Sequence, residues 1–330
     1  MAILKYNDRV YGQIKIEEPI IIELIKTRAL QRLKGVDQAG YFEPYFPGSR
    51  HSRFEHSLGD WWLLKKFGAS LEEQIAGLIH DVSHSVFSHC IDYILDEGSE
   101  QNHTYQDNIF KQYISQTEIP IILKKYGFSP EYIIDESNFP LQEKELPDLC
   151  ADRLDYSLRG LIIYKEVTME DVKKILNNLI IIDNHWVFNN KKTAEQYAWL
   201  FLILNRKYYS GIQTAVMFRT TADYLKYALT KKYISYPDLY TTDDYVLDKI
   251  NKHLSQDKEL VRLWQRMNKG NSYKNDKNNY EAHVFCKSRV VDPFIKQNHK
   301  IIRLSEIKPK WREIVKQEIK PKEYFLKFID

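Results

Sequence analysis

The spacing of apolar residues predicts a mainly helical protein. Over residues 19–34, which open on a proline, apolar positions recur every three or four residues, and this favours a helix. A second helix is expected at about residues 53–67, where Gly68 ends it. Ser70 and Glu73 have the spacing of a capping box ahead of another apolar stripe, so a third helix is expected to begin there.

The middle of the chain continues this helical pattern. A helix is expected over residues 87–95 and another after His103. Pro147 stands where a further helix would begin, because a proline is well tolerated in the first turn and an apolar stripe follows it.

Strand-like segments appear in the second half. Residues 179–190 contain two β-branched and aromatic runs around an Asp-Asn pair, which predicts a hairpin. Helices are expected over residues 193–209 and from about residue 221, and the polar residues 269–280 are expected to form a loop. The predicted fold class is therefore mainly α, with a helical core and a small α+β appendage in the C-terminal part.

Composition narrows the class of protein. The chain has 330 residues, of which 43% are hydrophobic and 28% charged, as is typical of globular proteins. A formal net charge of +3 is too balanced to indicate a general nucleic-acid or membrane binder. Three cysteines cannot form a disulfide framework, and we find neither a secretory signal nor an apolar stretch of about 20 residues. We expect a soluble, cytoplasmic protein with no membrane partner.

Histidine is unevenly distributed along the chain. Six of the ten histidines lie between positions 51 and 103, where even spacing would place between one and two. Because histidine is both the usual neutral metal ligand and the usual acid or base near pH 7, we expect the functional site in this region.

Two histidines and two aspartates are candidates for a metal site: His56, His80, Asp81 and Asp152. A mixed nitrogen and oxygen donor set accepts Mn²⁺, Fe²⁺, Mg²⁺, Ni²⁺, Co²⁺ or Zn²⁺, and the sequence does not distinguish among them. Adjacent side chains on a helix diverge by about 100°. His80 and Asp81 can therefore reach one ion only at a helix end, which the helix after Ser70 would provide.

The sequence around these residues resembles a known family. The resemblance lies in LQRLKGVDQAG, FPGSRHSRFEHSLG, IAGLIHDVSHSVFSH and DRLDY, which are similar to the deoxynucleoside triphosphate triphosphohydrolase branch of the HD-domain phosphohydrolases. VYGQIKIEEPIIIELIKTRALQRL and the late SRVVDPF resemble the same branch. The clear likeness covers about the first half of the chain. It implies an HD-domain catalytic core in residues 1–165, while residues 166–330 complete the substrate pocket and offer an oligomer interface.

The resemblance implies the ligands and the phosphate contacts. It implies that one divalent metal ion is bound by His56, His80, Asp81 and Asp152. It places Arg53 and Arg153 at the substrate phosphates, and guanidinium groups bind phosphate oxygens bidentately.

It also implies contacts to the nucleoside. Gln38 matches a glutamine that meets the sugar, Tyr156 would pack against the sugar, and Tyr209 would lie against the nucleobase. Asp155 shares a helix face with Asp152 and Tyr156, so we place it with the substrate-binding residues, although it can also orient a ligand imidazole.

Three further histidines are candidates for catalysis. His84 and His89 belong to the run HDVSHSVFSH, and His103 matches a family histidine implicated in acid–base chemistry. The resemblance places His84 close to the scissile phosphate and His89 in the same pocket. A general acid here would protonate the leaving nucleoside oxygen.

Four positions depart from the family pattern. Ala39 replaces a bulkier aliphatic residue near the ribose, and Gly160 replaces an aspartate directed toward the sugar. Lys26 stands where a well-studied member uses an aspartate to read guanine at an activator site, and Gly211 replaces a histidine. The phosphate-handling half of the motif set is thus intact, while the nucleoside-recognising half is altered.

The leading hypothesis is a metal-dependent phosphohydrolase that converts a dNTP to deoxynucleoside and triphosphate. A nucleotidase or phosphodiesterase acting on another phosphate ester is the alternative enzyme. A nucleotide- or nucleic-acid-binding regulator with a vestigial site is a third reading, because residues 300–330 hold nine Lys and Arg against five Asp and Glu. We expect a nucleotide substrate and a homo-oligomer, and we do not expect nucleic acid as a partner.

Overall fold

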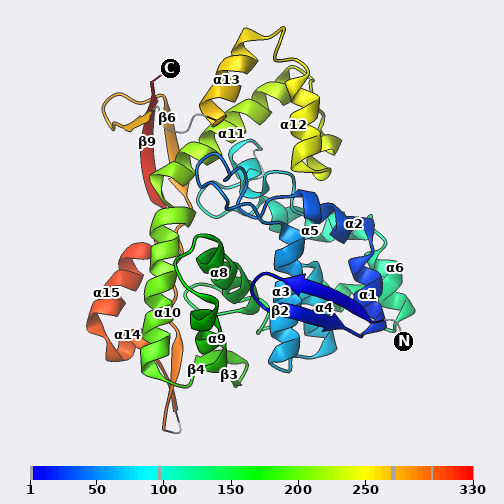
Figure 1. Ribbon diagram of the computed structural model, residues 1–330, viewed down its shortest axis with the longest axis vertical. Coiled ribbons are helices and arrows are strands. Elements are labelled where there is room, and N and C mark those ends of the chain that lie inside the picture. Colours follow the sequence, from blue (N-terminus) through cyan, green and yellow to red (C-terminus); the bar gives the residue numbers. More distant parts are fainter. Residues whose placement is uncertain (1–2, 96–97, 269–272, 299, 330) are drawn as a thin grey trace.

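The computed structural model describes residues 3–95, 98–268, 273–298 and 300–329. Helices dominate the described part of the chain (Figure 1), which confirms the mainly α prediction. The α-helices are α1 (Pro19–Ile25), α2 (Arg28–Arg32), α3 (Arg53–Lys66), α4 (Leu71–Ile79), α5 (Tyr105–Ser115), α6 (Ile119–Lys125), α7 (Pro130–Ile133), α8 (Ala151–Ile163), α9 (Met169–Asn177), α10 (Lys191–Leu204), α11 (Ile212–Thr230), α12 (Asp243–Asn251), α13 (Lys258–Asn268), α14 (Leu304–Ile307) and α15 (Pro309–Glu318).

Short helical turns and strands complete the fold. The 3₁₀ turns are η1 (Leu33–Gly35), η2 (Ser88–Tyr93), η3 (Glu136–Asn138) and η5 (Tyr236–Tyr240), and η4 (Asn205–Tyr209) is a π-helical turn. The strands are β1 (Leu4–Asp8), β2 (Gly12–Ile16), β3 (Leu179–Ile182), β4 (His185–Phe188), β5 (Tyr273–Asn275), β6 (Ala282–Cys286), β7 (Phe294–Gln297), β8 (Lys300–Arg303) and β9 (Lys322–Phe328).

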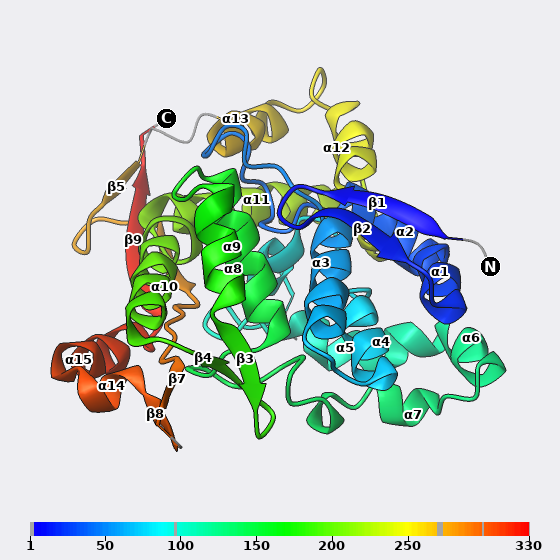
Figure 2. The same ribbon diagram turned by 60° about the horizontal axis from the view of Figure 1, so that its bottom comes forward.

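Three small sheets are attached to the helices. β1 and β2 form an antiparallel hairpin beside α3 (Figures 1 and 2). The predicted hairpin forms β3 and β4, and it extends into a sheet of order β3-β4-β7-β8, in which only the β4–β7 pair is parallel. β5, β9 and β6 make an antiparallel sheet near α11. The sheets therefore gather mainly in the second half of the chain, while the division at residue 165 stays a prediction.

α3 packs between α4 and α8 (Figure 2). Its residues Leu58 and Trp61 are buried in one apolar cluster with Ile75 of α4, while Leu64 is buried in a second cluster with Leu154 of α8. Burying a leucine side chain stabilises the fold by about 2 kcal/mol. This packing fixes the three backbone segments that carry the candidate ligands.

The helix predicted over residues 19–34 is interrupted. α1 ends at Ile25, and Thr27 caps a new helix by accepting a hydrogen bond from the Leu30 backbone N–H. The predicted Ser70 cap is present, but only half of the box forms. The Glu73 carboxylate accepts backbone N–H groups of the segment that precedes α8 instead.

Other predicted boundaries also differ. The helix assigned to Pro147 begins only at Ala151, and the one predicted at residues 87–95 is the 3₁₀ turn η2. α10 ends at Leu204 and continues as the π-helical turn η4, so the helix predicted over residues 193–209 changes its winding there. Of the loop predicted at residues 269–280, residues 269–272 lie outside the described residues and the next three form β5.

None of the helices in the described part of the chain has both the length and the apolar character needed to cross a bilayer.

Candidate active site

Three helices carry the candidate ligands. A capping box starts α3 and places His56 at the end of its first turn. His80 is the C-cap of α4, and Asp81 is the next residue. The backbone therefore departs from helical geometry at the point where two adjacent side chains have to reach the same metal ion. Asp152 lies in the first turn of α8. The helix end that two adjacent ligands require is therefore present.

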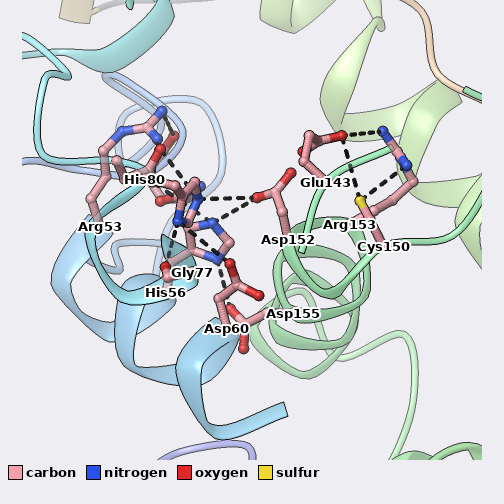
Figure 3. Close-up of polar contacts among 12 residues, drawn as sticks. Arg53, His56, Asp60, Gly77, His80, Glu143, Cys150, Asp152, Arg153 and Asp155 are labelled. Atoms are coloured by element: carbon pink, nitrogen blue, oxygen red, sulfur yellow. Dashed lines mark hydrogen bonds and ion pairs between the residues drawn. The ribbon is translucent and has the colours of Figure 1, made fainter. Parts of the chain in front are cut away.

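The four side chains converge (Figure 3). Asp152 Oδ1 lies 2.9 Å from His56 Nε2 and 3.5 Å from His80 Nε2. Asp81 lies against the same pair, with Oδ1 3.5 Å from His80 Nε2 and Oδ2 3.7 Å from His56 Nε2. One donor atom each of His56, His80 and Asp152 lie within 4.8 Å of one another, close enough to hold one metal ion.

Second contacts orient both imidazoles. His80 Nδ1 is 2.7 Å from the Gly77 carbonyl oxygen, which only accepts, so Nδ1 carries the hydrogen. His80 Nε2 is then left facing the cluster without a hydrogen-bond partner. His56 Nδ1 lies 2.8 Å from Asp155 Oδ2, which directs its Nε2 toward Asp152. Such contacts fix the tautomer and ring orientation of metal-binding histidines.

Asp155 is the centre of a buried network. Its carboxylate accepts from Arg159 at 3.0 and 2.9 Å and from the Tyr11 hydroxyl at 2.7 Å, and Arg159 also pairs with Asp8 at 3.1 Å. Burial would raise the pKa of Asp155, but Arg159 and His56 outweigh it and lower the pKa to about 2. Asp155 is fully buried and does not line the cavity described below, so its placement with the substrate-binding residues is corrected: it orients His56.

The donor set fits a divalent cation. Burial opposes ionisation of Asp81 and Asp152, yet Arg53 and the imidazoles outweigh it for Asp81, and the two neighbouring imidazoles do so for Asp152. The pKa of each carboxyl therefore lies well below its usual value. Two ionised carboxylates and two imidazoles with directed Nε2 atoms are ligands that a divalent transition metal accepts.

The two candidate phosphate-binding arginines are both buried, and hydrogen bonds fix the position of each guanidinium group. Arg53 Nη1 contacts Asp81 Oδ2 at 2.6 Å, and its Nε donates to the Ser88 hydroxyl at 2.7 Å. Arg153 points away from Asp152 and toward Glu143 (Figure 3), and it also donates to the backbone carbonyls of Lys144 and Asp148. Both side chains line one cavity with His80, Asp81 and Asp152, and of the two guanidinium groups only that of Arg53 contacts a candidate ligand.

The three candidate catalytic histidines form a row in the same cavity. His84 Nε2 lies 3.2 Å from Asp81 Oδ1. The rings of His84 and His89 are in edge-to-face contact, with their centroids 5.1 Å apart. The rings of His89 and His103 are stacked, with their centroids 4.5 Å apart. Asp92, which the sequence analysis did not single out, lies 3.4 Å from His89 Nδ1.

The cavity has a volume of about 570 Å³, within the range of small-molecule sites. Gln38, Tyr156 and Tyr209 line it as the sequence predicts. Gln38 Oε1 and the Tyr209 hydroxyl are buried without a hydrogen-bond partner, so each is available to a ligand. The remaining wall includes the aromatic residues Phe42, Tyr164, Tyr208 and Phe218.

Several known proteins are similar to this chain in sequence. YdhJ of Bacillus subtilis, whose name gives no activity, is 34% identical over 312 residues, which are 94% of each chain. The metal-dependent phosphohydrolase cns2 of Cordyceps militaris is 38% identical over 52% of this chain and 49% of its own. The deoxynucleoside triphosphate triphosphohydrolase SAMHD1 of Mus musculus is 33% identical over 38% of this chain and 22% of its own. The chain belongs to the HD-domain phosphohydrolases.

Solved structures have the same fold. A hypothetical protein from Aquifex aeolicus matches all of this chain and 97% of its own with a TM-score of 0.73, at 18% identity. A phosphohydrolase from Bacteroides thetaiotaomicron covers both chains completely with a TM-score of 0.67, also at 18% identity. A scan against models of protein families finds no match. At this identity the two solved structures show the fold of the chain.

Sequence analysis missed several cavity residues of this HD-domain phosphohydrolase. Lys287 and Arg289 follow β6 and line the cavity, although they lie more than a hundred positions after the last candidate ligand. Their alternating spacing at the end of a strand was the available signal. Tyr208 of the π-helical turn stacks on Tyr164 at 3.8 Å, and π-helical turns often mark functional sites.

Proposed function

We propose that this phosphohydrolase is a deoxynucleoside triphosphate triphosphohydrolase, which releases deoxynucleoside and triphosphate. The observation that carries the proposal is one cavity that combines the metal-binding group, the buried Arg53 and Arg153, and an aromatic wall. Phosphates require the cations, and a nucleobase requires a stacking surface. The likeness to SAMHD1 supports the same reaction.

A divalent ion held by His56, His80, Asp81 and Asp152 would supply a Lewis acid to a phosphoryl oxygen and lower the pKa of water. The side chains of this chain perform the other tasks. Arg53 is pinned to Asp81, and the guanidinium N–H groups that it has left can hold the substrate phosphate beside the ligands.

The leaving oxygen needs a proton, because hydrolysis adds the elements of water across the P–O bond. We assign this proton to His103, whose Nδ1 is buried in the cavity wall without a hydrogen-bond partner. Burial, with His89 and Arg289 adding to it, lowers the pKa of His103 well below its usual value. The charge of an entering phosphate raises that pKa again, so the substrate itself favours the protonated acid.

Hydrolysis of another phosphate ester, by a nucleotidase or phosphodiesterase, is the second candidate. cns2 shares more identity over a longer stretch than SAMHD1 does, and its name specifies no nucleotide. The small residues Ala39 and Gly160 also line the cavity and leave room around the sugar, which favours a broader range of substrates.

The test is a substrate panel. The purified protein, loaded first with Mn²⁺ and then with the other candidate ions, is incubated with the four dNTPs, the four NTPs and the corresponding monophosphates, and the products are separated by ion-exchange chromatography. We expect deoxynucleoside and triphosphate in equal amounts. Inorganic phosphate from monophosphates, without triphosphate from any dNTP, would establish the second candidate instead. Salt-sensitive binding of single strands without hydrolysis would favour a regulator.

A further inference from the structure

The C-terminal part of the chain contributes two cations to the cavity. After β6 the backbone continues without helix or strand pairing from Lys287 to Pro293. Lys287 and Arg289 are partly exposed and line the cavity, while Ser288 between them is buried on the other side. Alternate residues of an extended chain share a side, so the two cations face the same space.

Asn205 holds this segment in place. Its side-chain amide donates to the Ser288 hydroxyl at 3.0 Å, and its Oδ1 accepts the Arg289 backbone N–H at 2.8 Å. Ser288 in turn donates to the Glu318 carbonyl at 2.6 Å. Because Asn205 is fully buried, the backbone that presents the two cations is fixed before any ligand arrives.

Neither cation has a counter-ion within the described residues. Arg53 pairs with Asp81 and Arg153 with Glu143, but no ion pair involves Lys287 or Arg289. Among the described residues, the Arg289 guanidinium donates to the Lys287 carbonyl oxygen, at 3.3 Å, and lies 6.0 Å from the centroid of the Tyr209 ring. Burying a cation without a nearby anion costs free energy, so binding of an anion between Lys287 and Arg289 would be favourable.

The charges around the pair indicate which anion. Burial, with Arg289 adding to it, lowers the pKa of Lys287 to about 8, and Asp107 and Glu143 act in the opposite direction. Arg153 also lowers the pKa of Lys287, so it lies close by in the same cavity. Arg153, Lys287 and Arg289 thus place three positive charges along one wall of the cavity. Such a wall is suited to an anion that carries several negative charges, such as a polyphosphate chain.

We propose that Lys287 and Arg289 form a subsite for the polyphosphate chain beyond the phosphate that reacts. The inference rests on the proposed function and deepens it, because such a subsite makes the number of phosphates a determinant of specificity. On this proposal a monophosphate engages the metal ligands alone, whereas a triphosphate engages the metal ligands and this wall.

Kinetics with substrates of different phosphate number test the subsite. Lys287→Met and Arg289→Gln should each raise KM for a dNTP roughly ten-fold or more, and the double variant roughly a hundred-fold, whereas the inhibition constant of the matching dNMP should change far less. The comparison uses binding rather than kcat, because Arg289 also acts on the pKa of His103. Lys287→Arg should restore most of the loss, because it keeps the charge. Lys296→Met and Arg312→Gln are matched controls on the exposed surface of the same C-terminal part and should behave as the unaltered protein.

Binding of inorganic tripolyphosphate, followed by calorimetry on the metal-loaded protein, separates this inference from the proposed function. Weaker tripolyphosphate binding in the double variant supports the subsite, even if the unaltered protein hydrolyses no dNTP and the proposed function fails. Unchanged tripolyphosphate affinity, with unchanged KM for a dNTP that the unaltered protein does hydrolyse, overturns the subsite and leaves the proposed function standing.

Discussion

Adding one methyl group at Gly59 should weaken metal binding strongly while changing the free energy of unfolding little. Gly59 lies on α3 one turn after His56, and α8 approaches it closely. A Cβ built at Gly59 would lie 2.6 Å from the Asp155 carboxyl carbon and would overlap Asp155 Oδ1 and Arg159 Nη2. The variant Gly59→Ala must therefore displace the carboxylate that orients His56.

The size of the effect follows from these contacts. Restoring an ordinary contact of about 3.4 Å moves the carboxyl carbon by about 0.8 Å, enough to break the 2.8 Å hydrogen bond between Asp155 and His56. Loss of such an orienting partner lowers metal affinity by about 10- to 100-fold. Overpacking costs about 1–3 kcal/mol, but alanine favours the helix over glycine by about 1 kcal/mol, so the net loss of stability is only about 0–2 kcal/mol.

The assay is metal affinity by competition with a chromophoric chelator, alongside the free energy of unfolding in urea. Ser57→Ala is the control, because it removes a buried hydroxyl that has no hydrogen-bond partner and leaves Asp155 in place. Asp155→Asn should weaken metal binding as Gly59→Ala does, and the double variant should lose little more, because both act through one hydrogen bond. Full metal affinity in Gly59→Ala would refute the role given to Asp155.

Three further outcomes are expected. Asp81→Ala should lose the ion, measured by elemental analysis, and lower kcat/KM by more than about 100-fold; a chelator should reproduce this in the unaltered protein. Arg53→Gln should keep the ion yet raise KM by about 10- to 100-fold, in a steady-state assay at saturating metal. Burial, with Asp243 adding to it, raises the pKa of Asp37 to about 8, and burial, with Asp244 adding to it, raises the pKa of Asp243 to about 7. The stability that the protonated forms provide is therefore lost progressively as the pH rises from the ordinary aspartate pKa of about 4 to these values. Asp37→Asn should therefore gain about 2 kcal/mol on the unaltered protein between about pH 6 and about pH 8.5 in urea unfolding, and no relative gain would contradict the raised pKa.

Elements with local signals could be predicted from the sequence. α3 was placed to within one residue because a capping residue precedes it and Gly68 follows it, and the 179–190 hairpin because Asp183 and Asn184 tolerate the positive φ angles of its turn. The start of α11 could not be predicted in this way, because the helix begins at Ile212, nine residues before the predicted start. Its β-branched Thr220 is a weak helix former, but packing buries it and its hydroxyl bonds to the Val216 carbonyl.

The site divides in the same way. The candidate ligands could be proposed because they follow one another in recognisable motifs, and the structure brings all four together. The role of Asp155 needed the fold, since helix periodicity puts it on the ligand face without saying that α3 covers it. The alternation of Lys287 and Arg289 did not reveal which site they face, because their place at the cavity depends on long-range contacts, the pairing of β6 with β9 and the hydrogen bonds of Asn205.

The two ends of the cavity depend on each other. Asp81 and Asp152 place negative charge beside the imidazoles of the first half of the chain, and Lys287 and Arg289 place positive charge on the wall from the second half. The helices that carry the ligands and the contacts of Asn205 hold the two ends in place. If the proposed subsite is right, a metal ion at one end and phosphates at the other would relieve both charges at once, and a ligand that spans both ends would gain most from these preorganised groups.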